Sequence, residues 1–254
     1  MSDTVGTSAK PIWVDLSTSD PEAARKFYSS LLGWTAEPNP DPAFGGYTVA
    51  QLGGRDVAGI GPVMGEGQPT AWAMYIGTPD ASETAAAVEA AGGKVAVPPF
   101  DVMDQGRMGV FQDPSGAFFG VWQPGKMTGA QVMREPGSVG WTELNARGLP
   151  AARDFYHKVF GWEVKSLPMP EGMEYNELRS GGEPIGGAQE MPAMVPAEVP
   201  SHWLVYFLVD DIAATAARAQ ELGATAMMPV TDYPGGKFTI LADAQGATFG
   251  LIAA

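Results

Sequence analysis

The sequence predicts an α+β protein built from four related modules, two in each half of the chain. The first observation is an internal repeat, because the segment Trp13–Trp34 returns 128 positions later as Trp141–Trp162. The second is that each copy alternates apolar and polar residues, as a half-buried strand does, and then shows the spacing of an amphipathic helix. The third is a hairpin-type turn sequence near the end of each half, at Asp113 and Asp243.

The first strand of the first module is expected at residues 11–17. Val14 and Leu16 share the face that packs under a helix, because successive side chains of a strand point to opposite sides. The other face carries a large aromatic residue beside an acid, and the third module repeats this arrangement. The residues concerned are Trp13, Asp15 and Ser17 in the first module, and Trp141, Glu143 and Asn145 in the third.

A helix follows this strand. Asp20 is a suitable N-cap, Pro21 fits the first helical position, and Gly33 is typical of a helix end. Two short strands are then expected at residues 47–52 and 57–64, joined by a glycine turn. The third module repeats this plan of a strand, a helix and further strands.

The second module has the same plan with a different spacing. A strand is expected at residues 72–76, an alanine-rich helix at 81–91 and a short strand at 95–97, which ends before two prolines. A hairpin is expected from residues 107–111 and 117–122 around the turn that begins at Asp113. The fourth module repeats this plan.

The domain boundaries follow from the repeat. Residues 1–10 are expected to form a flexible lead, and the stretch 126–136, which contains proline and glycine, a linker. The first domain is then residues 11–125 and the second is residues 137–254. The expected modules are residues 11–65, 70–125, 137–192 and 201–254.

The composition limits the classes of function. A formal net charge of −14 without any Lys/Arg-rich run disfavours a nucleic-acid partner and an anionic membrane surface. No apolar stretch is long enough for a membrane span, and the N-terminus lacks the apolar core of a signal peptide, so we expect a cytoplasmic protein. The absence of cysteine excludes disulfides and thiolate metal sites, and only His157 and His202 supply imidazole.

These residues carry a family resemblance. The pattern D-x-x-x-A-x-x-F-Y-x-x-x-x-G-W after a strand, with a DPSG-type hairpin, resembles the vicinal oxygen chelate superfamily of glyoxalases, extradiol dioxygenases and bleomycin-resistance proteins. Within it, the chain is similar to two-domain actinobacterial glyoxalase-like proteins of aromatic polyketide antibiotic clusters. The resemblance implies tandem βαβββ modules that form two glyoxalase-like domains, with cup-shaped mixed sheets that enclose the sites.

The resemblance also implies where metal ligands would lie. Relatives that bind a metal take one ligand seven residues before the helix-capping position and a glutamate seven residues after the hairpin aspartate. Neither kind of position holds a metal-binding side chain in this sequence, so we expect no metal and no other cofactor. The equivalent positions are Trp13, Ala73, Gly120, Trp141, Leu204 and Gly250.

The same faces of the strands supply candidate ligand contacts. A tryptophan offers a flat apolar surface to a planar aromatic ligand, and a neighbouring carboxylate accepts from a phenol or pairs with an amine. The alternative is that both tryptophans fill the cups as core residues, and that the histidine only makes a local hydrogen bond. The candidates are Trp13, Asp15, Tyr75, Trp141, Glu143, Asn145, His202 and Tyr206.

Three functions remain open. The first is a metal-free protein that binds or sequesters a planar aromatic natural product, in an antibiotic-resistance or biosynthetic accessory role, as a monomer or homodimer. The second is an enzyme of lyase or oxygenase type that uses His202, Tyr206 or Glu143 as acid or base. The third is a protein-interaction module, which would expose a broad apolar patch.

Overall fold

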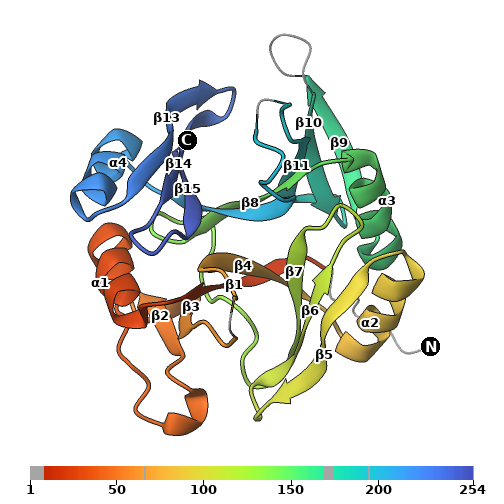
Figure 1. Cartoon of the computed structure of the whole chain (residues 1–254), viewed down its shortest axis with the longest axis horizontal. Helices are drawn as coiled ribbons and strands as arrows, with labels where there is room; N and C mark the ends of the chain where they lie inside the picture. The colour runs from red at the N-terminus through yellow and green to blue at the C-terminus, as the bar shows by residue number, and fades with distance from the viewer. Residues whose placement is uncertain (1–8, 66, 169–173, 194, 254) are drawn as a thin grey trace. The chain divides into compact units, whose positions relative to one another are not determined.

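A computed structural model describes residues 9–65, 67–168, 174–193 and 195–253 (Figure 1). Most of the expected lead therefore lies outside the described residues. The chain divides into two compact units that each combine segments from both halves of the sequence. Unit 1 comprises Met1–Ile12, Met74–Gly129 and Thr142–Trp203, and unit 2 comprises Trp13–Ala73, Ala130–Trp141 and Leu204–Ala254.

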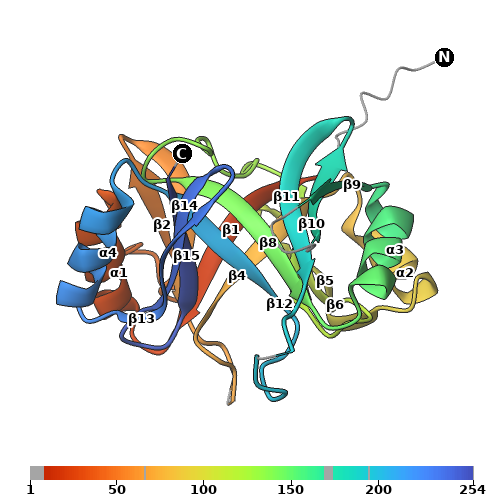
Figure 2. The same ribbon diagram turned by 90° about the horizontal axis from the view of Figure 1, so that it is seen from above.

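Unit 1 joins the second and third modules. Its strands follow the orders β4-β7-β6-β5 and β8-β11-β10-β9, and the first pair of each set is parallel whereas the others are antiparallel. Helices α2 and α3 pack side by side (Figures 1 and 2). The bounds are β4 (Ala71–Gly77), α2 (Ala81–Ala90), β5 (Lys94–Val102), β6 (Gly106–Gln112), β7 (Phe118–Pro124), β8 (Val139–Ala146), α3 (Leu149–Phe160), β9 (Glu163–Pro168), β10 (Glu174–Ser180) and β11 (Glu183–Glu190).

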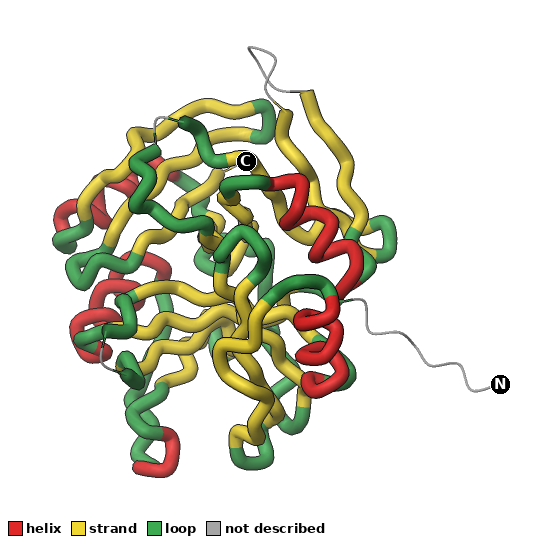
Figure 3. Tube along the Cα trace, turned by 45° about the vertical axis from the view of Figure 1, so that its right-hand side comes forward, coloured by secondary structure: helices red, strands yellow, loops and turns green. Residues whose placement is uncertain are grey.

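Unit 2 joins the first and fourth modules in the same way. Its strands follow the orders β2-β3-β1 and β13-β14-β15-β12, again mixing parallel and antiparallel pairs, and α1 packs against α4. Strands make up most of the regular structure (Figure 3). The bounds are β1 (Pro11–Thr18), α1 (Pro21–Leu32), the 3-10 helix η1 (Pro42–Phe44), β2 (Thr48–Leu52), β3 (Arg55–Pro62), β12 (His202–Leu208), α4 (Ile212–Glu221), β13 (Thr225–Tyr233), β14 (Gly236–Ala242) and β15 (Thr248–Ala253).

The α+β fold with tandem βαβββ modules is confirmed. The second, third and fourth modules each contain one strand, one helix and three further strands. In the first module, a single bridge between Thr35 and Gln51 stands where the others have a regular strand. The division into two domains at residues 11–125 and 137–254 stays a prediction. Among the described residues, no helix has the length and apolar character that crossing a bilayer requires.

Helix capping explains where the helices begin. In α1 the Asp20 side chain accepts from the backbone N–H of Ala23 at 3.0 Å, as its sequence position predicts. Helix α3 has Gly148 at this place, which offers no capping side chain. The Glu190 carboxylate at the end of β11 replaces it, accepting from the N–H groups of Gly148 and Leu149 at 2.8 Å each. A residue far along the chain thus caps this helix.

Each unit has an aromatic core centred on a tyrosine of the repeated Phe-Tyr pair. In unit 2, Tyr28 contacts Trp72 edge-on and stacks on Trp34. In unit 1, Tyr156 contacts Trp203 edge-on and stacks on Trp162. Both tyrosines are fully buried. Their ring contacts therefore hold α1 and α3 against the strands that carry the tryptophans.

Two strands depart from the expectation. Strand β5 does not end before Pro98 but continues to Val102, because it pairs with β6 alone and has register shifts where the prolines stand. An edge strand tolerates proline since the missing N–H faces away from a ladder. Strand β9 (Glu163–Pro168) was not expected, because its residues show no alternation of apolar and polar side chains.

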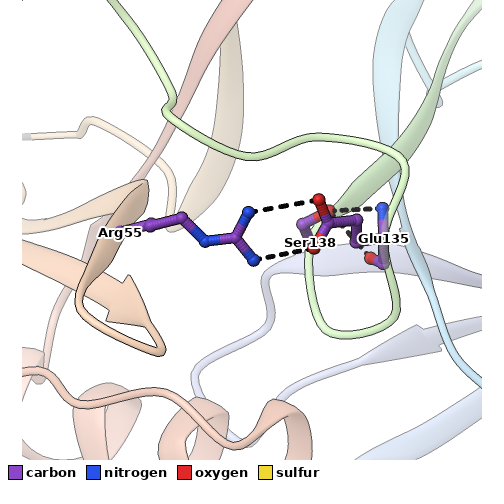
Figure 4. Close-up of polar contacts among 3 residues, drawn as sticks. All are labelled: Arg55, Glu135 and Ser138. Carbon is purple, nitrogen blue, oxygen red and sulfur yellow. Dashed lines mark hydrogen bonds and ion pairs between the residues drawn. The ribbon is translucent and has the colours of Figure 1, made fainter.

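The linker is tied to the first module by polar contacts in unit 2 (Figure 4). Arg55 donates to both carboxylate oxygens of Glu135, at 3.2 and 2.7 Å. The buried Ser138 hydroxyl donates to the Glu135 carbonyl at 2.8 Å and accepts from its N–H at 3.0 Å. These contacts hold the segment 131–138 in place. We call this segment the strap after residue 130.

Candidate functional site

The first candidate group lies in unit 2 around Trp13. Trp13 is only 4% exposed, and its indole N–H donates to the hydroxyl of Tyr47 at 2.9 Å. The Tyr47 side chain lies across two glycines of β3: a Cβ added to Gly59 would meet the hydroxyl at 1.8 Å, and one added to Gly61 would meet the ring at 3.0 Å. These glycines leave room for the Tyr47 ring. The chain's own tyrosine therefore covers this face of β3.

Burial raises the pKa of Tyr47 well above its usual value of 10, and the negative charge of Asp15 raises it further. The hydroxyl is therefore neutral at physiological pH and keeps its proton for donation. Asp15 is half-buried on β1, opposite Gly59 in the register with β3. Trp13, Asp15 and Tyr47 thus form one hydrogen-bonding group.

In unit 1, amide side chains contact Glu143, which is the counterpart of Asp15 in the repeat. Gln189 on β11 donates through Nε2 to Glu143 Oε1 at 3.1 Å and to Asn145 Oδ1 at 2.8 Å. Asn145 Nδ2 lies 3.5 Å from the same carboxylate oxygen. Glu143 is buried, whereas the two amides are partly exposed. We call these three residues the β8–β11 array.

Trp141 belongs to unit 2 and is partly exposed. Its ring lies 6.0 Å from the guanidinium of Arg134, which is a cation–π contact. Arg134 has a left-handed backbone with φ of 61° and donates its N–H to the Val139 carbonyl. The strap after residue 130 thus presents a cation to this ring.

The rings of the two remaining tyrosine candidates, Tyr75 and Tyr206, pack against glycine residues. A Cβ added to Gly120 would come within 2.2 Å of the Tyr75 ring, and one added to Gly250 within 2.0 Å of the Tyr206 ring. These glycines stand where metal-dependent relatives are expected to have glutamate. Both tyrosines are buried, so aromatic rings fill the space of the expected carboxylates.

The residues present do not fit a divalent metal of the family type. The six ligand-equivalent positions hold tryptophan, alanine, leucine and glycine, none of which is a donor to such a metal. In the part of the chain that the structure describes, no three His, Cys, Asp or Glu side chains converge as a metal site would need. The expectation that the protein works without a metal stays a prediction.

The histidine candidate makes a local contact. His202 at the start of β12 is partly exposed, and its Nδ1 lies 2.9 Å from the Pro200 carbonyl. This hydrogen bond places the proton on Nδ1 and leaves Nε2 as the acceptor of the neutral ring. His157 is exposed at the end of α3, with Nδ1 2.9 Å from the Trp162 carbonyl.

Sequence reasoning missed two residues of these groups, Tyr47 and Gln189. Tyr47 recurs as Tyr175, so the repeat contained a signal for it, but its position before a strand hid its contact with Trp13. Gln189 stands where the first module has Gly61, and that difference between copies was the available signal. A separate surface pocket of about 210 Å³ in unit 1 lies beside Asp104 and Arg107.

The chain matches the model of a known protein family. A family model described as the Glyoxalase/Bleomycin resistance protein/Dioxygenase superfamily matches residues 10–121 and 138–251. The chain belongs to this superfamily. The resemblance inferred from the D-x-x-x-A-x-x-F-Y pattern is thereby confirmed.

Curated relatives of this superfamily member extend over nearly the whole chain. CFP32 of Mycobacterium tuberculosis (strain CDC 1551 / Oshkosh), a proposed glyoxylase, is 41% identical over 247 residues, covering 95% of this chain and 94% of the relative. The anthracycline biosynthesis protein DnrV of Streptomyces peucetius is 40% identical over 256 residues, covering 95% of this chain and 92% of DnrV. The anthracycline biosynthesis protein DauV of Streptomyces sp. (strain C5) is 38% identical over the same length.

Solved structures share the fold at low identity. The 2,3-dioxygenase LapB of Pseudomonas sp. KL28 has a TM-score of 0.68 and 14% identity, covering 98% of this chain and 93% of LapB. The Mn(II)-bound glyoxalase of Novosphingobium aromaticivorans has a TM-score of 0.66 and 17% identity, covering 97% of this chain and 82% of that glyoxalase. At these identities the likeness shows the fold alone.

Proposed function

We propose that this glyoxalase-like protein binds or sequesters a planar aromatic natural product without a metal, as an accessory to biosynthesis of, or resistance to, an antibiotic. The observation that carries the proposal is the 40% identity to the anthracycline biosynthesis protein DnrV across almost the whole chain. The donor chemistry supports it, because the positions of the expected metal ligands hold tryptophan and small residues.

The contacts of the described residues suit such a ligand. Trp141 in unit 2 is partly exposed, and a tryptophan ring offers a flat apolar face to a planar aromatic ring. In unit 1, Glu143 is a buried carboxylate that accepts hydrogen bonds from the partly exposed amides of the β8–β11 array, as a carboxylate would from a ligand. The net charge of −14 favours neutral or cationic ligands over anions.

Tryptophan fluorescence tests the proposal. Titration of the full chain with daunorubicin, 1,4-dihydroxyanthraquinone and a naphthoquinone is expected to give saturable quenching with at least one of them. Trp141→Phe is expected to lose part of that quenching, whereas Trp13→Phe, at a buried position whose indole already binds Tyr47, keeps it. Quenching that does not saturate with any compound, in the wild type and in both variants alike, would overturn the proposal.

A second candidate function is a glyoxalase-like enzyme, which the 41% identity to CFP32 favours. In that function a carboxylate such as Glu143 would act as the general base on a carbonyl substrate. The assay is turnover of the hemithioacetal of methylglyoxal, with Glu143→Gln as the comparison. A rate that depends on protein concentration and is lost in that variant would favour this function, and a rate equal to the buffer blank would remove it.

A further inference from the structure

The contacts that hold each unit together are reciprocal between the half of the chain before the strap after residue 130 and the half that follows it. In unit 2 the Tyr28 hydroxyl of the first half donates to Asp243 Oδ2 of the second half at 3.0 Å. In unit 1, burial and then the negative charge of Asp113 raise the pKa of Tyr156, so the tyrosine of the second half faces the aspartate of the first. These tyrosines and aspartates are repeats of each other. Each half therefore supplies the tyrosine to one unit and the aspartate to the other.

Aromatic rings pack across the same boundary in both units. In unit 2 the ring centroids of Phe27 on α1 and Phe249 on β15 are 6.0 Å apart. In unit 1 their repeats, Phe155 on α3 and Phe119 on β7, are 5.9 Å apart. All four side chains are buried, and α1 packs against α4 as α2 packs against α3. A buried apolar boundary of this kind is typical of obligate partners, and the reciprocal contacts make the two faces self-complementary, as in a two-fold dimer.

The strap after residue 130 ties the two halves together in unit 2. The Gln131 N–H donates to the Asp56 carbonyl at 2.7 Å, and the Asp56 N–H donates to Gln131 Oε1 at 2.9 Å. The indole N–H of Trp34 donates to the Gly137 carbonyl at 2.6 Å. These partners belong to the first module, whereas the Gly137 N–H donates to the Leu208 carbonyl of the fourth module at 2.8 Å. The strap therefore holds the first and fourth modules of one chain in the same unit.

We infer that a second copy of this chain is a partner that fits these faces, and that two copies exchange halves unless the strap after residue 130 keeps each chain closed on itself. In the exchanged dimer each unit combines the first half of one copy with the second half of the other, and the contacts of Tyr28 and Tyr156 are retained. The linker makes pairing of a chain's own halves intramolecular, with an effective concentration of about 1 mM for a short flexible connection. Exchange therefore competes when the protein concentration approaches that value or when the linker is lengthened.

The test refolds a mixture of two full-length versions of the chain that carry different affinity tags. Capture on one tag is expected to retain at least about tenfold more of the other version after refolding at about 1 mM than at about 10 µM. An insertion of about 20 flexible residues after Thr128, an exposed position ahead of the strap, is expected to lower the concentration needed for exchange about fivefold. The same insertion between Gly181 and Gly182, in an exposed turn within one module, is the matched control and is expected to leave that concentration unchanged.

The lifetime of the captured dimer separates exchange from association of closed chains. Exchanged copies separate only by unfolding, so co-capture is expected to persist after about hundredfold dilution and to be absent when the folded versions are mixed. Loss of co-capture on dilution, equal co-capture at both concentrations, or an equal effect of the two insertions overturns the inference. Co-expression of both versions in one cell repeats the comparison of the insertions without refolding, and circular dichroism confirms that each variant is folded.

Discussion

The hydroxyl of Tyr28 and the carboxylate of Asp243 are joined by a 3.0 Å hydrogen bond, although 215 positions separate them in the chain. The same hydroxyl accepts from the indole N–H of Trp72 at 2.9 Å. Within unit 2, one phenol of the first module thus contacts the hairpin turn of the fourth module. In unit 1, Tyr156 accepts from Trp203 at 2.8 Å in the same manner.

Tyr28→Phe is expected to lower the free energy of unfolding by about 1–3 kcal/mol, because it leaves a buried indole N–H and a carboxylate oxygen without their partner. Tyr156→Phe is the matched variant in unit 1 and is expected to cost a similar amount, because the Tyr156 hydroxyl also accepts from Trp203 and interacts with the buried Asp113. Urea unfolding measures both variants, and wild-type stability in either of them would contradict this expectation.

The pH dependence of stability tests Asp243. Its burial raises the pKa of the carboxyl above 3.8, against the hydrogen bonds from Ala247 and Tyr28 that lower it. The native state therefore holds this proton to higher pH than the unfolded chain does. Its stabilisation is complete below pH 3.8 and is lost as the pH rises through the native pKa.

Asp243→Asn removes this titration. The unfolding free energy of the wild type minus that of the variant is expected to fall as the pH rises from 3.5 to 7, since all other carboxyls are common to both proteins. Urea titrations at several pH values give this difference. A difference that stays constant or grows with pH would show that the pKa of the Asp243 carboxyl is not raised in the native state.

The helix caps show how far sequence reasoning reaches. Asp20 and the repeated Gly-Trp pair were predictable, because caps and helix ends depend on neighbours in the chain. The cap of α3 was not, since Glu190 lies 41 and 42 positions from the N–H groups that it binds. The candidate groups followed the same rule: strand alternation predicted Trp13 and Glu143, but not Tyr47 or Gln189, whose contacts depend on tertiary packing.

Glu190→Ala tests the long-range cap. It is expected to lower the unfolding free energy by about 1 kcal/mol, because two N–H groups at the start of α3 lose their acceptor. Glu190→Gln retains one acceptor oxygen and is expected to lose about half as much. Thermal unfolding checks both variants, and wild-type stability in Glu190→Ala would show that water caps this helix equally well.

The strap after residue 130 offers a comparison of two kinds of polar contact. Ser138→Ala is expected to cost about 1–2 kcal/mol, because the buried hydroxyl satisfies both the carbonyl and the N–H of Glu135. Arg55→Ala removes an exposed ion pair, whose contribution is small and screened by salt. Unfolding at low and high salt is expected to show a salt-independent loss in the serine variant only.

A central claim of this account is that an aromatic ligand is bound without a metal. The most direct measurement is calorimetric titration of 1,4-dihydroxyanthraquinone into protein that has been dialysed against a chelator and shown to be metal-free by mass spectrometry. We predict saturable binding whose affinity is unchanged when Mn(II), Fe(II), Ni(II) or Zn(II) is restored. Binding that appears only after one of these metals is added would contradict the claim.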